Sequence, residues 1–170
     1  MSWTTYHHRK EALRDVLAIA DRRRQESTAT ELFAEVESVK TVFATEADLL
    51  LDVQMFWHQA LSGQLDRTLS AGAKDMEAFT VHAWTAVAER LPGARVLLDA
   101  NRDMPEMQVA FAKELELVAR SAGLPANHPE LLGHGRRIIE AARENVVDVP
   151  FVELVHATGF MSRFREAFAA

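Results

Sequence analysis

The stretch LLLDVQMFWHQAL, residues 49–61, decides the fold of this chain. Its large apolar side chains fall on more than one face of a helix, a pattern typical of a helix that other helices surround. Thr45 precedes the stretch as an expected N-cap, because its hydroxyl can accept a hydrogen bond from a free amide of the first turn. Gly72 follows it, as glycine commonly follows a helix end. We therefore predict a long central helix over residues 45–70.

The remainder of the chain also indicates helices. Apolar residues recur with a 3.6-residue rhythm, most of the five prolines and seven glycines lie between such segments, and alternating β-branched runs are nearly absent. Capping boxes predict helix starts after Thr28, Asp103 and Asn127, each followed three residues later by a glutamate. A chain of 170 residues with 48% hydrophobic content can bury the core of one domain. The prediction is an all-α fold, a single domain over residues 1–170 with a bundle of seven or eight helices.

Composition excludes several classes of protein. The absence of cysteine excludes disulfides, thiolate zinc sites and cysteine nucleophiles. The polar, charged N-terminus does not resemble a signal peptide, and no apolar run approaches the roughly 18 residues that a membrane span needs. A net charge of −6 disfavours nonspecific binding to nucleic acid or anionic lipid. We therefore expect a cytoplasmic protein that does not contact the membrane.

Three arginines, Arg22, Arg23 and Arg24, end the helix expected over residues 6–24. Cations in the last turn interact favourably with the negative end of the helix dipole. A nucleic-acid surface would need an excess of positive charge, but residues 1–45 hold seven Lys or Arg against seven Asp or Glu. We interpret the arginines as a solvated helix end and expect no nucleic-acid partner.

The histidines offer only a weak metal signal. His7 and His8 are adjacent, so on a helix they point about 100° apart and chelate poorly. Glu153 and His156 form an E-x-x-H pair on one helical face, a motif that di-iron bundles use twice together with two further glutamates. Here the motif occurs once. We predict no metal ligand and no cofactor, and keep a helical metal-binding protein as an alternative.

Aromatic and histidine side chains are neighbours on two of the expected helices. A pocket that combines apolar walls with a few polar groups is the common form of a small-molecule site. We expect such a pocket between the central helix, the helix over residues 75–91 and the helix that starts after Asp103. The expected ligand-binding residues are Leu51, Met55, Trp57, His58, His82 and Trp84. The structural alternative is that these histidines are buried and hydrogen-bond their neighbours. No nucleophile–base arrangement or glycine-rich phosphate loop is present, so no catalytic residue is predicted.

The last predicted helix, which starts near Pro150, carries aromatic residues at a four-residue spacing. Phe160, Phe164 and Phe168 therefore stack along one side of that helix. Further apolar residues occupy much of another side, which is more apolar surface than one docking contact usually buries. We predict a homodimer interface at these three phenylalanines, with a fully internal helix as the alternative.

Two resemblances bear on function. The strings SWTTYHHRKEALRDVLAIADRRR, FWHQALSG and ERLPGARVLLDANRD resemble a family of small all-helical actinobacterial proteins of unknown function, which implies a bacterial cytoplasmic setting. The string TATELFAEVESVKTVFATEADLLLDV resembles the end of the helix-turn-helix of TetR-type regulators and the start of their ligand domain. It departs from that family at the turn, where Glu37 stands near the position at which the family has a glycine. That second resemblance implies an all-helical effector domain that dimerises through its final helices.

The favoured function is a non-enzymatic, homodimeric helical domain that binds an apolar or amphipathic small molecule or a protein partner. The two alternatives are a TetR-like DNA-binding transcriptional regulator and the helical metal-binding protein.

Overall fold

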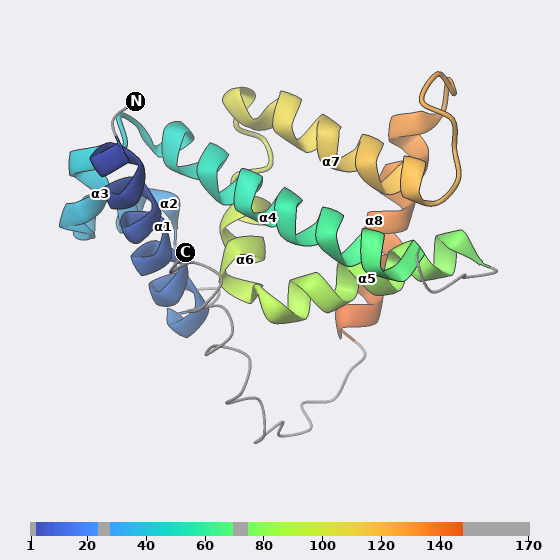
Figure 1. Ribbon diagram of the computed structural model, residues 1–170, viewed down its shortest axis with the longest axis horizontal. Helices are drawn as coiled ribbons and strands as arrows, with labels where there is room; N and C mark the ends of the chain where they lie inside the picture. The colour runs from blue at the N-terminus through green and yellow to red at the C-terminus, as the bar shows by residue number, and fades with distance from the viewer. Residues whose placement is uncertain (1–2, 24–27, 70–74, 148–170) are drawn as a thin grey trace.

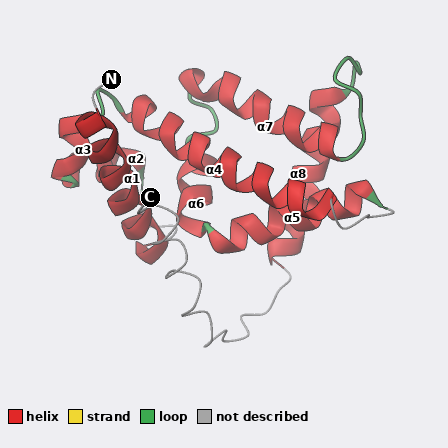
Figure 2. Cartoon of the chain, in the orientation of Figure 1, coloured by secondary structure: helices red, strands yellow, loops and turns green. Residues whose placement is uncertain are grey.

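The computed structural model describes residues 3–23, 28–69 and 75–147 of the chain. These residues form eight α-helices and one short 3-10 helix, with no strand among them (Figures 1 and 2). The helices are α1 (Trp3–Arg23), α2 (Ala29–Glu35), α3 (Glu37–Val42), α4 (Glu46–Leu69), α5 (Met76–Arg90), α6 (Pro92–Ala100), η2 (Pro105–Met107), α7 (Gln108–Ser121) and α8 (Leu131–Val147). The predicted all-α fold with a long central helix is confirmed.

Helix α4 is central because its neighbours surround it. It contacts α1, α2, α5, α6, α7 and η2, and it runs through the middle of the molecule in Figure 1. Thr45 caps it as predicted, since its Oγ1 accepts a hydrogen bond from the Asp48 amide at 3.1 Å. The buried apolar side chains of α4 lie at the spacing that turns one broad face to the core: Leu49, Leu50, Val53, Trp57, Leu61 and Leu65. None of the described helices is both long enough and apolar enough to cross a bilayer.

The predicted capping boxes have different outcomes. The Thr28 box is confirmed, because its hydroxyl accepts from the Glu31 amide and the Glu31 carboxylate accepts from the Thr28 amide, each at 3.1 Å. The box at Asp103 is wrong: Pro105 starts the 3-10 helix η2, and α7 begins only at Gln108. The box at Asn127 is also wrong, because the neighbouring His128 Nδ1 accepts from the Glu130 amide and α8 begins at Leu131.

Two glycines allow helices to approach closely. A Cβ on Gly93 would lie 2.5 Å from the Asp21 backbone nitrogen, so the backbones of α6 and α1 approach closely at this point. The Gly93 amide donates to Asp21 Oδ1 at 2.7 Å. A Cβ on Gly135 would lie 2.1 Å from the Leu115 carbonyl oxygen, which places the crossing of α8 over α7 at this residue.

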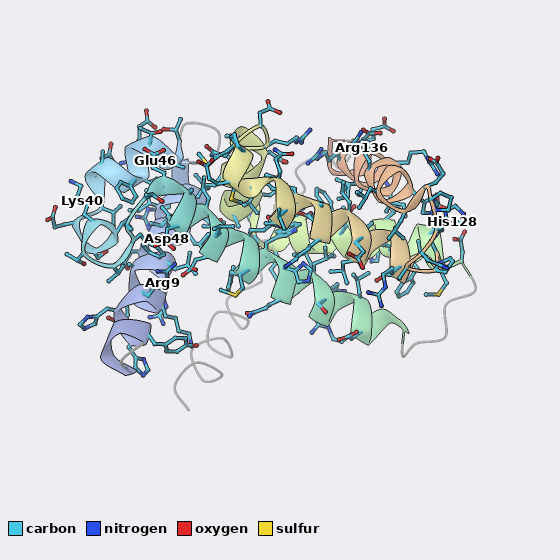
Figure 3. All side chains as sticks on the ribbon, turned by 90° about the horizontal axis from the view of Figure 1, so that it is seen from above. Arg9, Lys40, Glu46, Asp48, His128 and Arg136 are labelled. Atoms are coloured by element: carbon cyan, nitrogen blue, oxygen red, sulfur yellow. The ribbon has the colours of Figure 1, made fainter. Side chains whose placement is uncertain are left out.

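An ion-pair cluster joins α1 to α4. Arg9 Nη2 lies 2.6 Å from Asp48 Oδ1, and Arg9 Nε lies 2.6 Å from Asp52 Oδ2. The same guanidinium stacks 4.5 Å above the centre of the Phe43 ring. Figure 3 shows Arg9 and Asp48 beside each other where the two helices meet. This hydrogen bonding to Arg9 lowers the pKa of the Asp48 carboxyl.

Candidate functional site

A buried carboxylate, Glu114 of α7, lies at the centre of the polar network inside the bundle. Its Oε1 accepts from Trp57 Nε1 at 2.9 Å, from Trp84 Nε1 at 3.0 Å and from Arg95 Nη1 at 3.1 Å. Its Oε2 accepts from Gln54 Nε2 at 3.0 Å. One side chain therefore connects α4, α5, α6 and α7. A buried charge persists only where a partner charge and hydrogen bonds replace its hydration, and here both are present.

The surroundings of Glu114 favour its ionised form. Burial alone would raise the pKa of this carboxyl, but the positive charge of Arg95 and the hydrogen bonds from Gln54, Trp84 and Trp57 outweigh it and lower the pKa. The Arg95 guanidinium carbon lies 4.8 Å from the centre of the Trp57 ring and 5.6 Å from that of Trp84. Arg95 is thus held by a carboxylate and two aromatic faces.

A second carboxylate, Asp99 of α6, gathers three arginines at the edge of this network. Asp99 Oδ1 lies 3.0 Å from Arg95 Nη2, 3.1 Å from Arg102 Nη2 and 2.6 Å from Arg143 Nη2. The same oxygen is shared by side chains from α6, from the turn after α6 and from α8. The ion pairs therefore extend from the buried Glu114 to the surface.

A pocket of about 410 Å³ opens beside these arginines, between α6, α7 and α8. Helices α7 and α8 meet at Gly135 and lie across one another (Figure 1). The pocket lies between their facing sides, and Arg95 of α6 and the turn after α6 also line it. Its wall combines apolar side chains with four arginines and three carboxylates. The lining residues are Arg95, Arg102, Asp103, Gln108, Phe111, Ala112, Glu114, Leu115, Leu132, Arg136, Ile139, Glu140 and Arg143.

The predicted ligand-binding residues lie elsewhere. Trp57 and Trp84 come together, with ring centres 5.5 Å apart, but both are fully buried and face Glu114. Leu51 and Met55 lie on an exposed side of α4, His82 is exposed and His58 is half-buried. None of these six residues lines the pocket between α6, α7 and α8. In the described part of the chain they form two separate groups, a buried tryptophan pair and a scattered outer set.

The residues of the α6–α8 pocket carried a sequence signal that composition and motif arguments missed. Glu114 lies seven residues after Met107, three after Phe111 and four before Val118, so it occupies an apolar position of the helical repeat. Arg95 similarly interrupts the apolar face of α6, next to Leu98. Two opposite charges on inward-facing positions indicate a buried ion pair, because an unpaired charge there would be too costly.

The predicted helix-turn-helix stretch forms α2 and α3, which are joined through the single extended residue Val36. Their exposed charged side chains are Glu31, Glu35 and Glu37 against Lys40. More negative than positive charge faces solvent here, which does not favour contacts with DNA phosphates. The DNA-binding alternative stays a prediction without support from this surface.

Other predicted site residues lie outside the described part of the chain. These are the expected dimer-interface residues Phe160, Phe164 and Phe168 and the expected metal pair Glu153 and His156. Within residues 3–23, 28–69 and 75–147, no three His, Asp or Glu side chains come together as a metal site.

The chain matches no protein-family model, no curated protein and no solved structure. Its function is therefore inferred from the geometry of its own residues.

Proposed function

We propose that this protein is a non-enzymatic binding protein that takes an amphipathic small molecule into the pocket between α6, α7 and α8. The observation that carries the proposal is a pocket wall that combines apolar side chains with four arginines and three carboxylates. Its volume of about 410 Å³ is within the range of small-molecule sites, roughly 300–1,000 Å³. An amphipathic molecule would match both kinds of side chain in such a wall.

The polar groups of the pocket are suited to holding a ligand rather than to transferring protons. Arginine side chains stay protonated in proteins, so Arg102, Arg136 and Arg143 are donors only. Glu114 is held ionised and already accepts hydrogen bonds from four side chains, which makes it a poor general base. The remaining lining carboxylates, Asp103 and Glu140, are exposed. This chemistry supports binding and orientation.

The proposed site differs in position from the one that the sequence pattern suggested. The space between α4, α5 and α7 is filled by Trp57, Trp84 and the Glu114 network. The α6–α8 pocket lies on the outer side of that network, and Glu114 and Arg95 line both. Homodimer formation stays a separate prediction, because it depends on Phe160, Phe164 and Phe168, and a protein partner stays the predicted alternative to a small molecule.

The test is calorimetric titration of the full chain with octanoate, 1-octanol and octylamine, which share a chain length and differ in charge. We expect at least one of them to bind with a stoichiometry of one. Leu132→Asn should weaken binding, because Leu132 is an exposed apolar residue of the pocket wall. Val109→Asn is the matched control, since Val109 is an exposed apolar residue of α7 outside the wall. No binding by any of the three ligands, or equal loss in the two variants, would contradict the proposal.

A further inference from the structure

The arginines around the pocket exceed the carboxylates that hold them. Arg95 pairs with Glu114 and Asp99, while Arg102 and Arg143 both pair with Asp99. Three guanidinium groups therefore share two carboxylates, and all three contacts to Asp99 fall on its single Oδ1 atom. Each guanidinium has five N–H donors, so the two carboxylates accept hydrogen bonds from only some of them.

Part of that unused capacity is buried. Nε of Arg95 and Nε of Arg143 are covered from solvent and have no hydrogen-bond partner among the described residues. The Arg95 side chain is only 9% exposed. A buried donor without an acceptor costs about 1–3 kcal/mol. Among residues 3–23, 28–69 and 75–147, the donors of this arginine group are therefore incompletely satisfied beside the pocket.

A fourth arginine, Arg136 of α8 (labelled in Figure 3), lines the same pocket and forms no ion pair in the described part of the chain. Arg136 and Arg143 are seven residues apart, and Leu132 and Ile139 stand on the same side of α8. Apolar and basic side chains thus alternate along one helical face. Phe111 and Leu115 of α7 complete the apolar part of the wall.

Charge supports an anionic occupant. Burial lowers the pKa of Arg143, and the nearby positive charges of Arg102 and Arg95 lower it further, while the negative charges of Asp99 and Glu114 act in the opposite direction. An anion close to these side chains would offset both the burial of the Arg143 charge and its repulsion by the neighbouring arginines. Asp103 and Glu140 also line the pocket, but neither forms an ion pair with these arginines within residues 75–147. Their presence favours a singly charged ligand over a doubly charged one, because like charges in one site repel.

Resting on the proposed function, we infer that the ligand is an amphipathic monocarboxylate, whose carboxylate binds Arg136 and Arg143 while its apolar part lies along Phe111, Leu115 and Ile139. A guanidinium matches the two oxygens of a carboxylate in a bidentate arrangement. Arg136 is exposed and supplies a guanidinium that no described carboxylate holds. The apolar residues give the hydrocarbon part a surface to cover.

The experiment compares octanoate, 1-octanol, octylamine and inorganic phosphate by calorimetry with the full chain. We expect octanoate to bind at least tenfold more tightly than octanol, and octylamine more weakly than either. Raising the salt concentration from 50 mM to 500 mM should weaken octanoate binding but leave octanol binding unchanged, because salt screens the charged contact. Phosphate should not compete with octanoate at equal concentration.

Arg136→Gln tests the named residue. It should weaken octanoate binding roughly tenfold and leave octanol binding unchanged, and its thermal unfolding should match the wild type because the side chain is exposed. Arg14→Gln is the control, since it removes the same charge from an exposed position of α1 far from the pocket wall. It should change neither affinity.

The outcomes separate this inference from the proposed function. Octanol or octylamine binding as tightly as octanoate, an Arg136→Gln variant with unchanged octanoate affinity, or phosphate competing as an equal would each overturn the monocarboxylate. Failure of all three amphipathic ligands would instead overturn the pocket as a binding site.

Discussion

Replacing Glu114 tests whether the network at the centre of the bundle depends on charge or on hydrogen-bond geometry. In the wild type, Glu114 Oε1 accepts from Trp57, Trp84 and Arg95. In Glu114→Gln, the amide oxygen can take the place of Oε1 and accept the same three hydrogen bonds. The new amide nitrogen would then face Gln54, whose Oε1 has no partner among the described residues. Turning the Gln54 amide over would present that oxygen to the new N–H. The loss is therefore mainly the charge opposite Arg95.

Glu114→Leu removes the acceptors as well. Three neutral donors and one guanidinium lose their partner at Glu114, and each buried donor left unsatisfied costs about 1–3 kcal/mol. Breaking a buried ion pair costs about 3–5 kcal/mol, and such losses within one network are not additive. Asp99 still holds Arg95 in both variants, which limits the loss. We expect Glu114→Gln to lower the free energy of unfolding by about 2 kcal/mol and Glu114→Leu by about 5 kcal/mol.

Urea denaturation at pH 7, followed by the helical circular dichroism signal, measures both values by linear extrapolation. Glu116→Gln is the control, because Glu116 lies on the same helix and forms only a partly exposed pair with Arg120. Its effect should stay within about 0.5 kcal/mol. Equal losses of unfolding free energy in Glu114→Gln and Glu114→Leu would refute the argument that the glutamine amide keeps the hydrogen bonds of the network. A Leu variant as stable as the wild type would refute the role of Glu114 altogether.

Two further predictions concern acid and the crossing of α7 and α8. The pKa of Glu114 in the folded protein lies below its ordinary value of 4.5, so the ionised carboxylate stabilises the fold above pH 4.5. This contribution is lost as the pH falls from 4.5 through the lower pKa of the folded state. The free energy of unfolding should thus fall more steeply below pH 4.5 in the wild type than in Glu114→Gln, and parallel pH profiles would contradict this. Gly135→Ala should lower stability by about 2 kcal/mol, since its Cβ would lie 2.1 Å from the Leu115 carbonyl oxygen. A Cβ on Gly133 of the same helix meets only flexible side chains, Glu130 at 3.3 Å and Arg137 at 3.9 Å, so Gly133→Ala should raise stability by up to about 1 kcal/mol. Thermal shifts of the same sign in the two variants would count against the close approach at Gly135.

The elements that the sequence predicted correctly depend on local physics. The α4 helix follows from continuous apolar periodicity, and the caps at Thr28 and Thr45 follow from hydrogen bonds within a single turn. Two other capping boxes failed because local sequence offered a competitor: the proline that starts η2, and the imidazole of His128. Val36 makes no side-chain cap, so no capping motif predicted the division between α2 and α3 at this residue.

The candidate site depends on contacts between distant segments, which periodicity does not describe. The apolar residues of α4 cover much of its circumference, so the sequence did not show that Trp57 would be buried while Leu51 and Met55 stay exposed. The meeting of Trp57 with Trp84 also depends on how α5 docks. The α6–α8 pocket lies where two helices cross at a glycine, and a crossing point follows from tertiary packing. The opposite charges at inward-facing positions of α6 and α7 were the one usable clue.

The tryptophan pair also gives the folded chain an optical signature. The indoles of Trp57 and Trp84 lie 5.5 Å apart with their planes at 70°, and both donate to the same oxygen of Glu114. Fixed, asymmetric aromatic neighbours of this kind produce a near-ultraviolet dichroism band, which disappears when side-chain packing loosens while helices persist. Because the two rings come from α4 and α5 and the carboxylate from α7, the band reports the docking of three helices at once. An unlabelled sample thus distinguishes a packed bundle from a loosened one.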